Sequence, residues 1–184
     1  MTNTRRRPTA LGRFLEILFG SGSTPPAAPA PTTGVPAGFR APAESPGRSG
    51  PSATREIDPR SLEGVRVAYA PDDDEAPDPG EIVWTWVPYE EADGRGKDRP
   101  VVVVAADGRG GFLALQLTSK AHAGEAEYLA IGSGAWDASG RGSWVDLGRV
   151  FLVRAEGMRR EAAALDAAAY GRIADAVRAR YGWA

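Results

Sequence analysis

The large aromatic residues of this 184-residue chain are confined to its later part. All five Trp and all five Tyr lie at Tyr69 or beyond, whereas ten of the fifteen Pro fall within the first 60 residues. Because a folded core is built mainly from bulky apolar side chains, only the later part of the chain can bury one. We therefore expect three regions: a disordered segment over residues 1–60, an acidic lead-in over residues 61–79 and a compact domain over residues 80–184.

Residues 20–59 are dominated by Gly, Ser, Thr, Pro and Ala. This composition buries too little apolar surface to offset the entropy cost of ordering, and its prolines favour an extended chain. Before it, residues 11–19 place Leu and Phe at helical spacing after three consecutive Arg, which predicts a short amphipathic helix. The helix is shorter than the ~20 residues needed to cross a membrane, and no signal-peptide cleavage site follows it. Weak contact with a membrane surface, docking to a partner protein and no function at all remain open.

The charge and the scarcity of reactive side chains narrow the possible chemistry. There is no Cys, which excludes disulfides, zinc–thiolate sites and Cys nucleophiles. The single histidine, His122, argues against a His-rich metal site, and we expect it to be a solvated loop residue. We predict neither a metal nor a cofactor. The net charge is −2, and six of the acidic residues cluster between Pro71 and Glu81, so a nucleic-acid site would have to be a local basic patch.

Runs of β-branched and aromatic residues between Gly-rich turns predict a mainly β domain. Strands are expected at residues 81–87, 99–106, 112–119, 127–131 and 144–153, and an Asp-Gly pair between the second and third is typical of a hairpin turn. A helix is expected over residues 167–181, with Asp166 as its N-cap and Gly182 after its end. Residues 62–70 form either a short capping strand or a lead-in. Because no helix separates successive strands, we expect a small, strongly curved barrel.

Three cationic residues, Arg95, Lys97 and Arg99, lie within five positions of one another at the entrance to a Val-rich strand. Such a cluster attracts phosphate groups. The alternative is an ordinary solvated loop in which Asp93 and Asp98 neutralise the cations, and composition alone favours this alternative.

Four short motifs follow one another between residues 80 and 150. They are Gly80-Glu81-Ile82-Val83-Trp84, then Gly96-Lys97-Asp98-Arg99-Pro100 before four Val, then Leu117-Thr118-Ser119-Lys120, and then Val145-Asp146-Leu147-Gly148-Arg149-Val150. With this order and spacing, and with a C-terminal helix to follow, the chain resembles the PemK/MazF family of toxin endoribonucleases over residues 80–181. The resemblance implies an SH3-like barrel of the PemK/MazF/CcdB type, usually a homodimer, in the cytoplasm. It also implies cleavage of single-stranded RNA without a metal ion, a cognate antitoxin as protein partner, and DNA binding by the complex of the two.

The resemblance assigns roles to particular residues. Arg99 and Thr118 match the catalytic positions of the family, and Asp146 matches an acidic position used in some members. The residues expected to contact RNA are Arg95, Lys97, Ser119, Lys120 and Trp144. In the family's reaction the 2′-hydroxyl of the RNA attacks the neighbouring phosphate and leaves a cyclic phosphate, so the protein need not supply a nucleophile. A planar guanidinium such as that of Arg99 suits the charge that builds up on the phosphate.

Two features of the chain depart from this pattern. Trp144 stands where some relatives have an arginine, which removes one cation, and its ring is expected to stack on a base. The loop over residues 89–98 is more acidic than an RNA channel favours. Asp146 also has an alternative role, as a strand residue paired with Arg149. A second hypothesis is therefore a catalytically inactive barrel that serves as a protein-interaction module.

Overall fold

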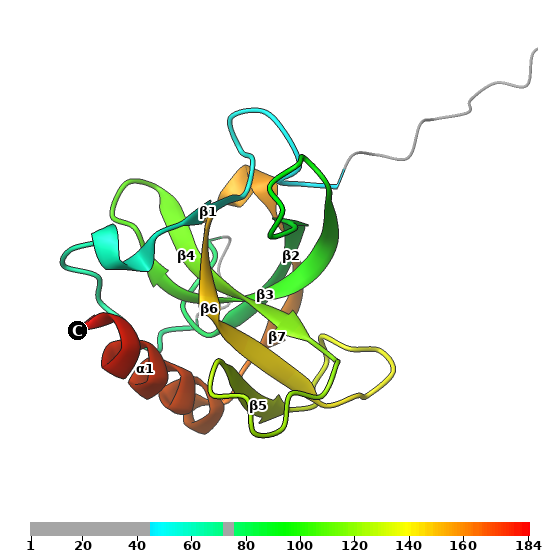
Figure 1. The fold of residues 1–184 in the computed structure, drawn as a ribbon, viewed down its shortest axis with the longest axis vertical. Helices are drawn as coiled ribbons and strands as arrows, with labels where there is room; N and C mark the ends of the chain where they lie inside the picture. The colour runs from blue at the N-terminus through cyan, green and yellow to red at the C-terminus, as the bar shows by residue number, and fades with distance from the viewer. Residues whose placement is uncertain (1–44, 72–75) are drawn as a thin grey trace, which may run out of the picture. The chain divides into compact units, whose positions relative to one another are not determined.

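A strongly curved antiparallel sheet forms the body of the computed structural model, which describes residues 45–71 and 76–184 (Figure 1). The elements are β1 (Arg55–Ile57), the 3-10 helix η1 (Pro59–Ser61), β2 (Glu81–Pro88), β3 (Gly96–Ala106), β4 (Gly111–Thr118), β5 (Tyr128–Gly132), β6 (Ser143–Arg154), the 3-10 helix η2 (Ala155–Gly157), β7 (Arg159–Ala164) and α1 (Ala167–Tyr181). The strand order is β1-β6-β4-β3-β2-β7, and β5 pairs with β6. The predicted mainly β fold with a C-terminal helix is confirmed for the described residues.

Strand β3 is buried on both of its faces. The side chains of Val101 to Ala105 are fully buried, and successive side chains of a strand point to opposite faces of the sheet. Val102 and Val104 pack into a core shared with α1, whereas Val101 and Val103 pack into a second core with side chains of β2 and β6. A strand covered on both faces needs no polar alternation, which explains the run of four Val.

Helix α1 begins and ends where the sequence predicts. The Asp166 carboxylate accepts a hydrogen bond from the Ala169 N–H at 2.7 Å, and Gly182 ends the helix with a φ of 73°. Its buried stripe faces the first core and consists of Ala169, Tyr170, Ile173, Ala174 and Val177. The Tyr170 hydroxyl donates to the Val104 carbonyl at 2.8 Å, which ties the helix to the central strand. Among the described residues, no helix is long and apolar enough to cross a membrane.

Residues 45–61 pack on the barrel, although the composition predicts disorder up to residue 60. Strand β1 pairs with β6, the Trp86 N–H donates to the Pro46 carbonyl at 2.9 Å, and the buried hydroxyls of Thr54 and Thr85 lie 2.6 Å apart. These contacts come from backbone groups and hydroxyls, which composition does not reveal. The expectation of disorder is therefore corrected for residues 45–60. The helix predicted over residues 11–19 lies outside the described residues, and the division of the chain before residue 45 stays a prediction.

Residues 62–71 run beside the C-terminus without forming a strand. Val65 and Val67 are buried, the Val67 N–H donates to the Ala184 carbonyl at 2.7 Å, and the Ala184 N–H donates to the Val65 carbonyl at 2.9 Å. Of the two alternatives for this segment, the lead-in is therefore the one observed. Strand β7, for which the sequence predicts no element, pairs with β2 and completes the sheet.

Candidate functional site

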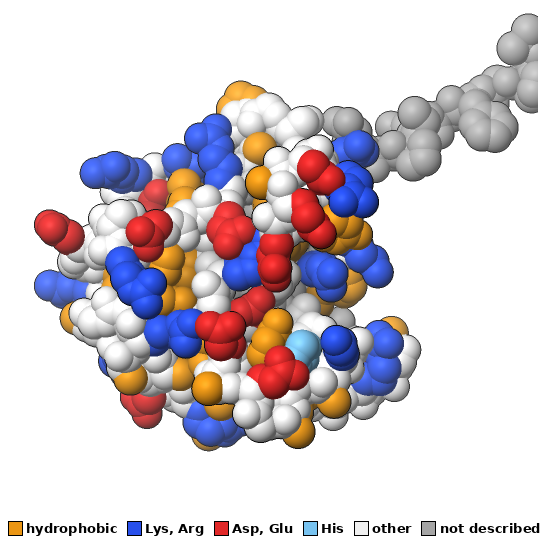
Figure 2. Space-filling view, viewed as in Figure 1, with side chains coloured by type: hydrophobic (Ala, Val, Ile, Leu, Met, Phe, Trp, Pro, Cys, Tyr) orange, Lys and Arg blue, Asp and Glu red, His pale blue; other side chains and the backbone are white. Residues whose placement is uncertain are grey.

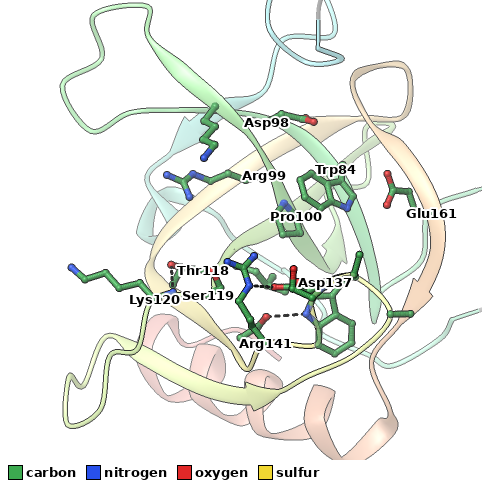
Figure 3. A pocket seen from close by; sticks show the side chains of 17 residues that line it. Trp84, Asp98, Arg99, Pro100, Thr118, Ser119, Lys120, Asp137, Arg141 and Glu161 are labelled. Atoms are coloured by element: carbon green, nitrogen blue, oxygen red, sulfur yellow. Dashed lines mark hydrogen bonds and ion pairs between the residues drawn. The ribbon is translucent and has the colours of Figure 1, made fainter. Parts of the chain in front are cut away.

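A cleft with a volume of about 500 Å³ opens where the start of β3 meets the end of β4 (Figure 3). Its walls include residues 97–100 of β3, residues 117–120, part of the loop between β5 and β6, and Trp84 and Glu161. Five of the predicted site residues line it, and they are Lys97, Arg99, Thr118, Ser119 and Lys120. We call this hollow the Arg99 cleft. Among the described residues, no group of three or more His, Asp or Glu side chains is arranged to hold a metal ion.

Strands β3 and β4 carry Arg99 and Thr118 to the same cleft. The ladder between the two strands ends at the Val101–Gln116 pair, and Arg99 and Thr118 lie two residues beyond that pair, where both line the cleft. The Thr118 hydroxyl accepts a hydrogen bond from the Lys120 backbone N–H at 3.1 Å. Its own proton is therefore free to be donated to a ligand in the cleft.

The acidic neighbours of the basic cluster do not neutralise Arg99. Asp93 pairs with Arg95, with 2.6 Å between Oδ2 and Nε, and hydrogen bonds from the backbone N–H and side chain of Arg95 hold the pKa of Asp93 below its ordinary value. Asp98 pairs with Arg159 of β7, with 2.8 Å between Oδ2 and Nη1. The Arg99 guanidinium has no hydrogen bond or ion pair with any other described residue. The alternative in which Asp93 and Asp98 neutralise the basic cluster is therefore correct for Arg95 but not for Arg99.

Arg95 lines a second cleft on the other side of Arg99. This hollow of about 470 Å³ is lined by residues 88–91, Arg95, Arg99, Gln116 and Arg149. The Arg95 guanidinium also lies 5.9 Å from the centre of the Tyr89 ring. Arg99 is therefore shared by the two clefts. Because β3 begins at Gly96, three residues of the predicted polar loop, Gly96, Lys97 and Asp98, are instead strand residues paired with β2.

Asp146 is buried and does not line the Arg99 cleft. Its Oδ2 accepts a hydrogen bond from Gln116 Nε2 at 2.7 Å, and its Oδ1 accepts one from the Gly148 N–H at 2.8 Å. The alternative partner, Arg149, instead forms an ion pair with Glu56, with 2.5 Å between Nη2 and Oε2. Asp146 thus fixes the amide of Gln116, which faces the second cleft.

Trp144 and His122 belong to an aromatic cluster outside the Arg99 cleft. The His122 ring stacks on Tyr128 with 3.6 Å between ring centroids, and the edge of one ring faces the other in the His122–Trp144 pair at 6.5 Å. His122 Nδ1 lies 3.0 Å from Glu125 Oε2. The expectation that His122 is solvated is wrong, since 8% of this residue is exposed. The Trp144 ring thus already has an aromatic neighbour within the protein. Its stacking on a base stays a prediction.

Comparison with known proteins places the chain in a family. Residues 78–180 match the family of PemK-like, MazF-like toxins of type II toxin–antitoxin systems. The chain belongs to this toxin family. No curated protein matches the chain.

Solved structures of MazE–MazF from Deinococcus radiodurans are similar to this PemK/MazF-family chain. One, crystal form III, is 18% identical, with a TM-score of 0.44, and the match covers 59% of this chain and 98% of the other. Another, crystal form II, is 20% identical, with a TM-score of 0.38 and coverage of 62% and 95%.

In this member of the PemK/MazF family, the loop between β5 and β6 supplies a wall of the Arg99 cleft that the sequence does not predict. Trp136 is buried, and its Nε1 donates to the Ser143 hydroxyl at 3.0 Å. Arg141 Nε donates to Asp137 Oδ2 at 2.9 Å. The sequence indicates only a turn-rich segment here. The only sequence signal for the pairing of Asp137 with Arg141 is their separation by four positions.

Proposed function

We propose that this toxin cleaves single-stranded RNA in the Arg99 cleft, without a metal ion. The observation that carries the proposal is that the unpaired guanidinium of Arg99 and the Thr118 hydroxyl line the same cleft. Lys97 and Lys120 line the same cleft, and neither side chain has an ion pair with another described residue. Unpaired cations around a hydroxyl donor are the groups that attract and hold a phosphodiester.

In the proposed reaction the 2′-hydroxyl of one nucleotide attacks the phosphorus on its 3′ side. A bond forms from the 2′-oxygen to phosphorus while the bond to the 5′-oxygen of the next nucleotide breaks. The proton of the 2′-hydroxyl passes to solvent water, and the departing 5′-oxygen takes a proton from solvent water, so the products are a 2′,3′-cyclic phosphate and a 5′-hydroxyl. Negative charge grows on the two non-bridging oxygens, where the fork of the Arg99 guanidinium can donate two hydrogen bonds. The Thr118 hydroxyl donates a third.

Arg99 acts through its charge in this proposal, because an arginine side chain stays protonated near neutral pH and is therefore a poor proton shuttle. Asp146 is a positioning residue. Both of its oxygens already accept hydrogen bonds, and its contact with Gln116 orients an amide beside Arg99 in the second cleft. Arg95 contacts RNA only if the strand continues from the Arg99 cleft into this second cleft.

A cleavage assay tests the proposal. Purified full-length protein is incubated with a mixed-sequence RNA, with and without EDTA, and the new ends are identified as cyclic phosphate and 5′-hydroxyl. Removing one preorganised donor to a transition-state oxyanion costs about 10²–10³-fold in rate, so Arg99→Ala should lose cleavage to that extent. Arg99→Lys keeps the charge without the fork and should recover only part of the rate.

Arg172→Ala is the matched control, since it removes an equal charge from an exposed position on α1 that does not line the cleft. It should cleave like the wild type. Cleavage that is unaffected by Arg99→Ala, or that EDTA abolishes, would contradict the proposal. A wild-type protein that neither binds nor cuts RNA would favour the second hypothesis, an inactive barrel that binds other proteins.

The family match also supports a cognate antitoxin as the protein partner. We propose that this antitoxin lies across the Arg99 cleft and competes with RNA for its cations. Adding the antitoxin should then protect RNA from cleavage. The homodimer stays a prediction, and light scattering of the purified chain measures its mass directly.

A further inference from the structure

Arg141 reaches into the Arg99 cleft from the loop between β5 and β6. Figure 3 shows its guanidinium beside Thr118 and Ser119 and below Pro100, on the opposite wall from Arg99. The Arg141 side chain is 61% exposed, so solvent and ligands have access to it. The catalytic roles that the family resemblance assigns do not include this residue.

The loop holds Arg141 in place through Asp137. The Arg141 Nε donates to Asp137 Oδ2 at 2.9 Å, and the Ser139 N–H donates to Asp137 Oδ1 at 2.8 Å. The Gly140 N–H also donates to the Asp137 carbonyl at 2.8 Å, so both the backbone and the side chain of Asp137 are fixed within one turn. The hydrogen bond from the Ser139 N–H is the main cause that keeps the pKa of Asp137 below its ordinary value. Asp137 therefore remains a carboxylate near neutral pH and continues to accept the hydrogen bond from Arg141.

Trp136 anchors this turn to the barrel. Its ring is buried, and the hydrogen bond from Nε1 to the Ser143 hydroxyl joins the start of the turn to the first residue of β6. Gly134 packs so closely on the ring that an added Cβ would lie 2.0 Å from a ring carbon. The Asp137–Arg141 pair lies between these two anchored positions, so the loop presents Arg141 on a fixed base.

The contact with Asp137 leaves the outer edge of the guanidinium free. The hydrogen bond to Asp137 comes from Nε. Nη1 and Nη2 of Arg141 have no hydrogen bond with any described residue. These two nitrogens form the fork that binds phosphate oxygens in a bidentate manner. Another guanidinium near the cleft, that of Arg159, differs in this respect, since its Nη1 already donates to Asp98.

We infer that Arg141 is a second phosphate-binding guanidinium, which contacts a backbone phosphate next to the one held by Arg99. The inference rests on the proposed function, since it assumes that RNA occupies this cleft. Two guanidinium groups on opposite walls would fix how a single strand lies across the cleft. A contact to a neighbouring phosphate acts equally in the ground state and the transition state, so it should lower KM and leave kcat unchanged.

Binding to an uncleavable substrate tests the inference. The motif found in the cleavage assay is synthesised with 2′-deoxyribose at the cleaved nucleotide, which removes the attacking hydroxyl. For Arg141→Ala we expect about tenfold weaker binding, because a single charge-assisted contact that is partly neutralised by Asp137 contributes on this scale. The plot of log K against log salt concentration should also become shallower by about 0.7, the value for one phosphate contact on a single strand. In the cleavage assay KM should rise by a similar factor while kcat stays constant.

Arg141→Lys separates charge from geometry. It should restore the salt dependence but only part of the affinity, since an ammonium lacks the fork. Arg172→Ala should match the wild type in both measurements, and circular dichroism checks that all variants fold. If the wild type cleaves RNA and Arg141→Ala has unchanged affinity and salt dependence, the inference is overturned while the proposed function stands. If the wild type neither binds nor cleaves RNA, both are overturned.

Discussion

Replacing Thr85 with Val tests whether residues 45–54 are an integral part of the barrel. Thr85 is fully buried, and its hydroxyl donates to the Gly157 carbonyl at 2.6 Å. Because a hydroxyl has one proton, the 2.6 Å contact between Thr54 and Thr85 must be donated by Thr54. Valine keeps the shape of the side chain but removes both short bonds, together with a longer 3.5 Å contact from the hydroxyl to the Pro46 carbonyl. At about 1–1.5 kcal/mol for each bond lost with its partner left buried, the free energy of unfolding should fall by about 2–3 kcal/mol.

Urea unfolding followed by Trp fluorescence measures this loss. With a slope of about 2 kcal/mol per molar urea, the midpoint of Thr85→Val should fall by about 1–1.5 M. Thr54→Val removes only one of the two bonds and should cost about half as much. The double variant should cost less than the sum of the single variants, because they share the bond between the two hydroxyls. A midpoint shift below about 0.3 M for Thr85→Val, or strictly additive effects, would refute the reasoning.

Two further predictions concern the cleft loop and alkaline pH. Gly134→Ala forces the Trp136 ring to move, so it should destabilise the protein by about 1–3 kcal/mol in thermal unfolding and weaken RNA cleavage. Burial raises the pKa of Tyr170 above its ordinary value of 10.0, so the folded state favours the neutral phenol. This stabilisation is complete below pH about 10 and is lost as the pH rises further. In an alkaline titration followed by circular dichroism, Tyr170→Phe should therefore lose stability less steeply than the wild type.

The elements that the sequence predicts are those with local determinants. Helix α1 has a capping carboxylate at Asp166, a glycine with positive φ at Gly182 and an apolar stripe between them. Strands β2, β3 and β6 are rich in β-branched and aromatic residues, and β4 is a mainly apolar run between Gly111 and Thr118 that follows an Asp-Gly turn. Strands β1 and β7 have neither signal, since their sequences are REI and RREAAA. They form because the edges of β6 and β2 offer unpaired backbone groups, which is a tertiary effect.

The candidate site also consists of a part that local sequence signals predict and a part that depends on tertiary contacts. Arg99 and Thr118 can be predicted because each lies beside a strong apolar run, and the pairing of β3 with β4 then places both in one cleft. Asp137 and Arg141 lie on a loop whose shape depends on the burial of the Trp136 ring in the first core, which is a tertiary contact. The burial of His122 is also not predictable locally, since this ring stacks on Tyr128 of β5. The sequence therefore predicts the part of the cleft formed by β3, β4 and the two residues after β4, but not the part formed by the loop between β5 and β6.

The pairing of charges explains how an acidic chain keeps a cationic cleft. Acidic and basic side chains lie intermixed over the face seen in Figure 2. Several carboxylates form ion pairs with arginines that do not line the Arg99 cleft. These ion pairs are Arg95–Asp93, Arg149–Glu56, Arg160–Glu81 and Arg180–Glu127. Asp98, the carboxylate next to Arg99 in sequence, points to Arg159 across the sheet. Both residues line the cleft, but successive side chains of a strand face opposite ways, so the Asp98 carboxylate points away from the Arg99 guanidinium (Figure 3). The net charge of −2 is thus compatible with a local phosphate site, because strand geometry decides which cations stay unpaired.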